Sequence, residues 1–203
     1  MFMSLGREVR VLKKKGGRGD ISFYINIPKE VQYLMGNPEK YRIKALSDRI
    51  VLWPIRDTEV KAGEVSLNEL QKELEMSLQD ESVKSNEVSC TEVVSFIDRQ
   101  AYSHDGIMEV ITFCLGNKHE HTSLVKYNDG TFEIIKYGLS CGYGGTSPGT
   151  LVQLISYLTQ RPRHDPKIEF IEKVIKSNEM REGAIKIEVN TIDNKIVITP
   201  IKQ

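Results

Sequence analysis

The strict alternation of apolar and polar residues in the first 56 positions is the strongest constraint on how this chain folds. Every second residue of ISFYINI, residues 21–27, is apolar, which is typical of a strand with one buried face. The same period of two predicts three further strands, over residues 5–13, 41–46 and 49–55. Between the second and third strands, Pro28 begins a short helix that Gly36 ends. The segment is therefore predicted as β-β-α-β-β.

The net charge of zero hides a strong segregation of charge along the chain. Residues 1–56 hold 12 basic and 5 acidic side chains, residues 57–87 hold 3 and 9, and residues 88–203 hold 13 and 14. The neutral total is a cancellation, so it does not exclude a nucleic-acid partner. The basic residues expected to contact DNA are Arg7, Arg10, Lys13, Lys14, Lys15, Arg18 and Lys29. The alternative for this basic run is a solvated hairpin tip.

Residues 5–56 resemble the swapped-hairpin DNA-binding domain of the AbrB, MazE and SpoVT regulators and antitoxins. The resemblance depends on Ile27-Pro28-Lys29-Glu30 at the start of the helix, Gly36 at its end and Arg49-Ile50-Val51-Leu52 in the last strand. It implies that two chains exchange hairpins to form one β-barrel, and that the dimer binds double-stranded DNA. A four-stranded unit of about 50 residues would bury little core alone, which agrees with a dimer. The resemblance makes Arg18 the candidate for a base edge, and the lysines candidates for phosphates.

Residues 57–87 are expected to form an acidic connector. Four leucines recur there at helical spacing, and Ser66 followed by Glu69 is a capping-box pattern, so a short amphipathic helix is predicted. That helix either packs its leucine face onto a neighbouring domain, which we favour, or mediates dimerisation. Residues 80–87 are expected to be the linker proper.

Residues 88–203 show the mixed pattern of an α+β domain. Strands are predicted in residues 106–116, 122–128 and 131–138, with Asn128-Asp129-Gly130 as a hairpin turn, and residues 92–102 fit a strand or a helix. Two helices are expected, one after residue 146 with Thr146 or Ser147 as its cap and one over residues 167–178. A terminal hairpin, residues 184–190 and 195–201, repeats the pattern of residues 48–55, which we attribute to coincidence rather than to a half-copy of the N-terminal unit.

A glycine-rich loop precedes the first of those helices. Glycines before a helix N-terminus leave backbone N–H groups free to bind an anion, so the loop is a possible ligand site through Gly142, Gly144, Gly145, Thr146 and Ser147. No phosphate-loop or dinucleotide fingerprint is present. The stretch also resembles short uncharacterised phage and plasmid domains with a similar turn, a family that brings no known activity. A tight strand-to-helix turn is the favoured interpretation.

The remaining residues with chemical potential do not form a recognisable catalytic or metal-binding pattern. Cys114, His119 and His121 fit no common zinc spacing, and Cys141 has no evident histidine partner. We therefore expect no enzyme activity, no metal and no cofactor. Three widely spaced cysteines are expected to be reduced thiols of a cytoplasmic protein. The lack of an apolar run of about 18 residues argues against a membrane span, and the order of residues at the N-terminus argues against a signal peptide.

Taken together, the sequence predicts a dimeric DNA-binding protein, with residues 1–56 as the DNA-binding unit and residues 88–203 as a domain for oligomerisation, a protein partner or an effector. An antitoxin is a variant of this hypothesis. The alternative from another class is a ligand- or nucleotide-binding protein that uses the Gly142–Gly149 loop and only dimerises through its N-terminal unit.

Overall fold

The N-terminal segment forms two antiparallel hairpins in the computed structural model, which describes residues 11–15, 21–25, 29, 41–45, 50–62 and 65–203. Strand β1 (Val11–Lys15) pairs with β2 (Ile21–Ile25), and β3 (Tyr41–Ala45) pairs with β4 (Ile50–Pro54). Strands β2, β3 and β4 lie within three of the predicted strands, whereas β1 overlaps the first predicted strand, residues 5–13, only at residues 11–13. The barrel that two chains would build from them lies outside what the described residues test and stays a prediction.

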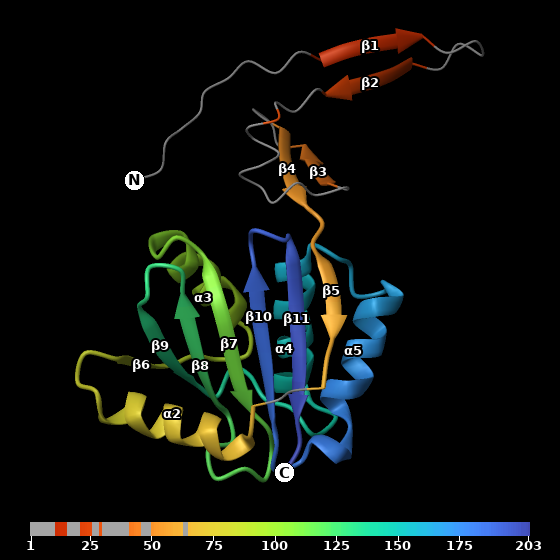
Figure 1. Ribbon diagram of the computed structural model, residues 1–203. Helices are drawn as coiled ribbons and strands as arrows, with labels where there is room; N and C mark the ends of the chain where they lie inside the picture. The colour runs from red at the N-terminus through yellow and green to blue at the C-terminus, as the bar shows by residue number, and fades with distance from the viewer. Residues whose placement is uncertain (1–10, 16–20, 26–28, 30–40, 46–49, 63–64) are drawn as a thin grey trace.

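The rest of the chain is one mixed sheet with helices on both faces, an α+β fold (Figure 1). Seven strands lie in the order β5-β11-β10-β7-β8-β9-β6, and the two edge strands β5 and β6 pair parallel to their neighbours while all other pairs are antiparallel. The strands are β5 (Asp57–Val60), β6 (Lys84–Glu87), β7 (Ile107–Phe113), β8 (Thr122–Tyr127), β9 (Phe132–Lys136), β10 (Ala184–Asn190) and β11 (Lys195–Ile201).

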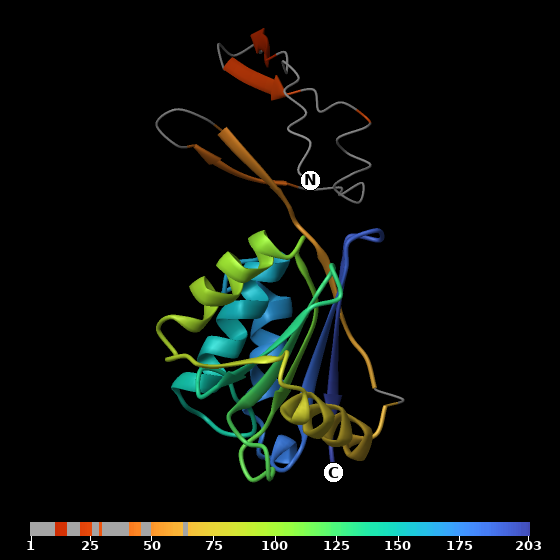
Figure 2. The ribbon, with the colours of Figure 1, turned by 90° about the vertical axis from the view of Figure 1, so that its left-hand side faces the viewer.

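Three helices cover one face of the sheet, and a fourth lies on the other face (Figure 2). The first group is α3 (Val93–Ser103), α4 (Thr146–Thr159) and α5 (Pro166–Lys176), and the opposite face carries α2 (Leu67–Gln79). A short 3₁₀ turn, η1 (Asn178–Met180), follows α5. Both faces of the central strands are therefore buried: on β7, Val110 packs in the α3–α5 core and Ile111 in the α2 core. This explains why residues 107–113 have an almost continuous apolar sequence.

Several helix boundaries follow from local chemistry. Ser66 and Glu69 form the predicted capping box at the start of α2, and Asp165 caps α5 just before Pro166. Residues 92–102, which fitted either state, form nearly all of helix α3 and its N-cap. The expected cap of α4 is wrong: Gly145 is its N-cap, and Thr146 and Ser147 lie inside the helix.

The prediction of a linker at residues 80–87 is wrong, because β6 within it pairs with β9. At the other end of the acidic segment, β5 pairs with β11, and between them Leu70 and Leu74 of α2 are buried in the smaller core. The favoured interpretation of the leucine face, packing onto a domain, is confirmed. The charged residues of this segment fit its position at both edges and on one face of the sheet, where much of each element meets solvent.

The C-terminal hairpin β10–β11 lies inside this sheet, with β7 on one side and β5 on the other. The described residues contain no helix long and apolar enough to cross a membrane.

Candidate functional sites

The basic residues expected to contact DNA lie partly in the described segment. Lys13, Lys14 and Lys15 belong to β1, where Lys14 is the partner of Ser22, and Lys29 is exposed. Strand β1 runs to Lys15, two residues beyond the predicted end of this strand at residue 13. Arg7, Arg10 and Arg18 lie outside the described residues.

Residues 55–57, which we call the junction, connect the N-terminal segment to the sheet domain and form hydrogen bonds with two other segments. Only two residues separate the end of β4 from the start of β5. The Arg56 N–H donates to the Thr159 carbonyl (3.2 Å), the Asp57 N–H to the Asn194 carbonyl (3.0 Å), and the Asn194 side-chain amide to the Ile55 carbonyl (3.2 Å). These hydrogen bonds connect the residues between β4 and β5 to the end of α4 and to the turn between β10 and β11.

The glycine-rich loop fills the space at the start of α4 with its own backbone. Gly142 has φ +83°, and its N–H donates to the Ile175 carbonyl (2.8 Å). A Cβ at Gly142 would lie 3.2 Å from the Arg181 backbone nitrogen, and a Cβ at Gly145 would overlap the Tyr143 ring. Glycine is therefore required at residue 142, where φ is positive and backbone atoms are close, while a side chain at residue 145 would have to displace the Tyr143 ring.

One polar side chain of the same loop already has a protein partner. The Ser147 hydroxyl is buried and lies 3.2 Å from the Cys90 sulfur. The Thr150 hydroxyl lies within hydrogen-bond distance of the Thr146 carbonyl (3.1 Å). Gly144 and Thr146 are exposed. This geometry favours the tight-turn interpretation, and anion binding by these five residues stays a prediction.

The prediction of three reduced cysteines is wrong. Cys114, just after β7, and Cys141, just before the glycine loop, form a disulfide, and both are fully buried. The Leu115 N–H donates to the Cys141 carbonyl (2.9 Å), so the two segments are already in contact. Cys90 is the free cysteine. Because disulfides are uncommon in reducing compartments, the cysteines no longer support the expected cytoplasmic location.

The residues weighed as metal ligands have other partners. The Cys114 sulfur is in the disulfide, His119 Nε2 lies 3.3 Å from a Glu75 oxygen, and His121 packs edge-on against Tyr143. Within the described part of the chain, no group of three or more His, Cys, Asp or Glu side chains is placed to hold a metal ion.

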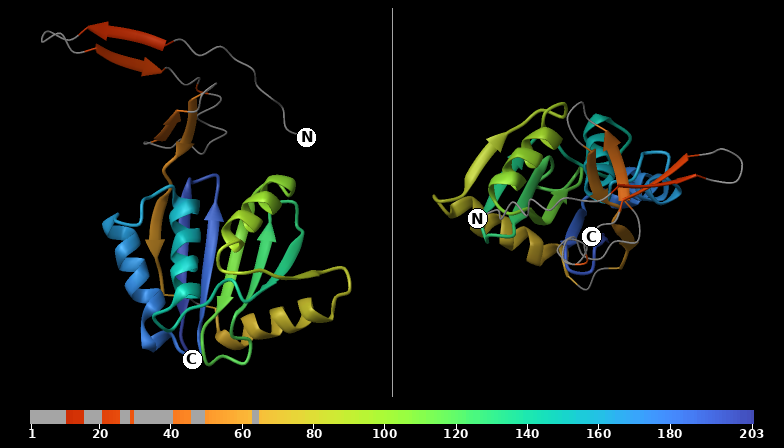
Figure 3. Two further views of the ribbon diagram at one scale, coloured as in Figure 1. Left: turned by 180° about the vertical axis from the view of Figure 1, so that it is seen from behind. Right: turned by 90° about the horizontal axis from the view of Figure 1, so that it is seen from above.

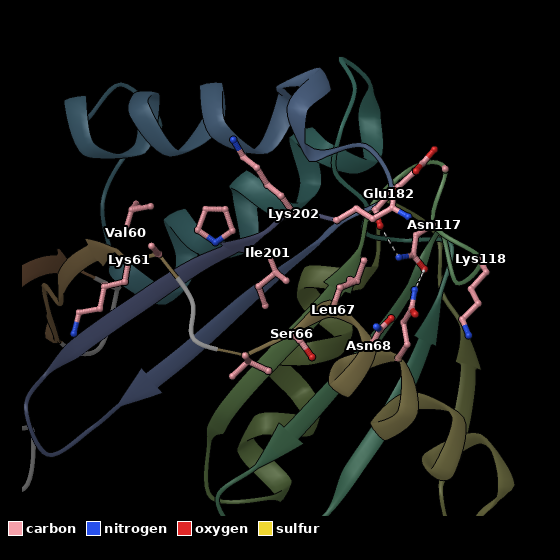
Figure 4. A pocket seen from close by; sticks show the side chains of 16 residues that line it. Val60, Lys61, Ser66, Leu67, Asn68, Asn117, Lys118, Glu182, Ile201 and Lys202 are labelled. Atoms are coloured by element: carbon pink, nitrogen blue, oxygen red, sulfur yellow. Dashed lines mark hydrogen bonds between the residues drawn. The ribbon is translucent and has the colours of Figure 1, made fainter.

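One hollow, of about 840 Å³, opens beside the N-terminus of α2 (Figure 4). Its buried polar group is Asn117, whose side-chain amide donates to the Glu182 carbonyl (2.8 Å) and whose oxygen accepts from Gln71 and from the His119 N–H. Lys118 and Lys202 on its rim pair with Glu75 and Glu179. These polar groups are thus satisfied within the protein, and Val60, Val65, Leu67 and Ile201 add apolar surface to the lining.

A second hollow, of about 480 Å³, lies at the junction, where it is lined by segments far apart in the sequence. The residue before β5, the start of β7, the ends of α4 and β10 and the β8–β9 turn line this hollow. The rear view in Figure 3 shows these segments at the same end of the sheet. Arg56, Tyr157 and Gln160 line it from the α4 side, and Asp98 and Asp105 from α3 and the turn after it.

Arg56 is the cation of this junction cavity. One Nη donates to the Leu158 carbonyl at the C-terminus of α4 (2.8 Å), and among the described residues no carboxylate pairs with the guanidinium. Burial lowers the pKa of Arg56, and the nearby Tyr157 hydroxyl acts in the opposite direction. The Tyr157 hydroxyl in turn donates to Asp98; burial, together with this hydrogen bond, raises the pKa of Tyr157.

Sequence reasoning did not single out this cavity. Arg56 has no motif around it, and its neighbours in space come from residues 98–107, 128, 157–160 and 189–191. No periodicity or spacing connects such positions before the fold is known.

Comparisons with known protein families, with curated proteins and with solved structures find no match for this chain.

Proposed function

We propose that this protein is a dimeric DNA-binding regulator, in which the N-terminal hairpins bind the duplex and the seven-stranded domain is carried beside them. The observation on which this depends most is the concentration of seven basic residues between Arg7 and Lys29. A two-fold dimer would double these charges, and neutralising several phosphates at once is the main source of affinity for duplex DNA.

The charge of the sheet domain supports DNA binding by the N-terminal segment and an orientation in which the sheet domain lies away from the duplex. Residues 57–203 hold 16 basic and 23 acidic side chains, so the domain is repelled by DNA while the N-terminal segment is attracted. The junction adds a constraint, because the hydrogen bonds at Arg56 and Asp57 leave no flexible linker on the domain side. In a dimer the two sheet domains would therefore take defined positions relative to the duplex.

The proposal is tested by measuring the affinity of the full chain for a fluorescent duplex of mixed sequence. Binding that depends on several phosphate contacts should weaken by roughly a hundredfold or more between about 50 and 200 mM salt. The double substitution K14A/R18A should weaken binding by about tenfold or more while light scattering still reports a dimer.

The matched control is K72A/K84A, which removes the same charge from exposed positions of the sheet domain. Equal affinity of the two double variants, or binding that is insensitive to salt, would contradict the proposal. Nucleotide binding at the glycine loop remains an alternative that none of the described contacts favours.

A further inference from the structure

The junction cavity combines one cation with two anions around an apolar floor. Arg56 lies on one side, Asp98 and Asp105 contribute carboxylates, and Ile107, Leu158 and Val189 supply apolar surface. At about 480 Å³ the cavity is within the range of small-molecule sites.

Arg56 retains donors for a further partner. A guanidinium has five N–H donors, and Arg56 uses one of them in its hydrogen bond to the Leu158 carbonyl. Among the described residues no carboxylate pairs with the other donors. A half-buried guanidinium favours a bidentate anion, because a charge-assisted pair compensates the loss of water. A carboxylate has the matching planar geometry.

The two aspartates restrict which other charged groups a ligand bound to Arg56 can have. Asp98 accepts the Tyr157 hydroxyl through one oxygen, and both aspartates are exposed. Because two carboxylates and one guanidinium line the same cavity, a dianion such as phosphate is disfavoured, while a molecule with its own ammonium group is favoured.

From this arrangement we infer that the junction cavity binds a small zwitterion, an α-amino acid with an apolar side chain. Its carboxylate contacts Arg56, its ammonium group faces Asp98 and Asp105, and its side chain covers Ile107, Leu158 and Val189. The cavity lies against the residues that connect β4 to β5, so an occupant contacts the point where the N-terminal segment joins the sheet domain. Binding to this cavity does not depend on the protein being a DNA-binding regulator.

The test uses thermal unfolding of the full chain with alanine, valine, leucine, isoleucine and phenylalanine, each at about 10 mM, since a ligand that binds the native state raises the midpoint. At least one of them should raise it. For that amino acid, the amide, which lacks the carboxylate, and the deaminated acid, which lacks the ammonium group, should have much weaker effects.

Variants separate the two charged contacts. R56Q should abolish the shift, and D105N should weaken binding several-fold without disturbing the fold, because Asn also tolerates the positive φ of residue 105. The double variant D98N/D105N should reverse the preference, so that the deaminated acid binds more tightly than the amino acid. Circular dichroism confirms that each variant is folded.

If none of the five amino acids raises the midpoint above a matched salt control, the inference is wrong. It is also wrong if the shift is the same in folded D98N/D105N as in the wild type.

Discussion

The two ends of helix α4 differ in a way that is instructive for finding sites. At its N-terminus, the glycine loop is unusual in sequence, yet its glycines pack against Arg181 and Tyr143 and its serine against Cys90. At its C-terminus, an ordinary sequence ending in Gln160 borders the junction cavity. The glycines allow close packing between segments of this protein. The junction cavity, in contrast, forms where several segments end next to one another.

The largest expected effect concerns the disulfide at the N-terminal end of α4. Replacing both Cys114 and Cys141 with Ala should lower the free energy of unfolding by about 3–4 kcal/mol, because the bond closes a loop across a separation of 27 residues. Denaturant unfolding measures this loss, with Cys90→Ala as the control that leaves the bond intact. Equal stability of the double variant and the wild type under oxidising conditions would show that the bond does not hold this end of the helix together.

The next effect separates the glycines that the turn requires from the one that it does not. Gly142→Ala should cost about 1–3 kcal/mol, because the residue has φ +83° and its Cβ would press on the Arg181 backbone. Gly144→Ala is the matched control, since a Cβ there meets nothing within 4 Å. Thermal unfolding of the two variants compares them directly. Similar losses, or a greater loss at Gly144, would remove the argument that packing explains the loop.

The smallest effect lies just beyond the C-terminal end of α4, at Asp165. This carboxylate caps α5 and pairs with Arg161 (3.0 Å). Burial alone would raise its pKa, but the hydrogen bond from the Lys167 N–H and the Arg161 ion pair outweigh it, so the pKa of Asp165 is lowered. A carboxyl whose pKa is lower in the folded state stabilises the protein above its unfolded value of about 4, and this stability is lost as the pH falls through the folded pKa.

Asp165→Ala should therefore cost about 1 kcal/mol at neutral pH, as loss of a helix cap does. Asp165→Asn retains the cap oxygen and should cost less, but it should remove the acid dependence contributed by this group. Urea unfolding at pH 7 and at about pH 3 measures both quantities. The interpretation fails if the asparagine variant keeps the full difference between the two pH values.

Much of the sheet domain could be predicted because local patterns dominate it. The turn Asn128-Asp129-Gly130 sets the β8–β9 hairpin, Ser66 and Glu69 set the start of α2, and the period of residues 184–201 sets the last hairpin. The error at residues 80–87 has a physical cause. A four-residue edge strand with one partner needs few apolar residues, so its polar sequence resembles a linker.

The sequence by itself determined most of the strands and helices, which segments are basic or acidic, and which faces are apolar, since each of these depends on neighbours along the chain. Only the tertiary structure decided that β5 and β6 close the two edges of one sheet, that Cys114 meets Cys141, and that Arg56 borders a cavity with Asp98 and Tyr157. Hydrophobic periodicity predicts that a side chain is buried, but it does not identify the side chains that bury it, because contact with any apolar neighbour stabilises the fold. Pairing partners, disulfides and cavities depend on which distant segments come together, and that choice is made by the packing of the whole domain.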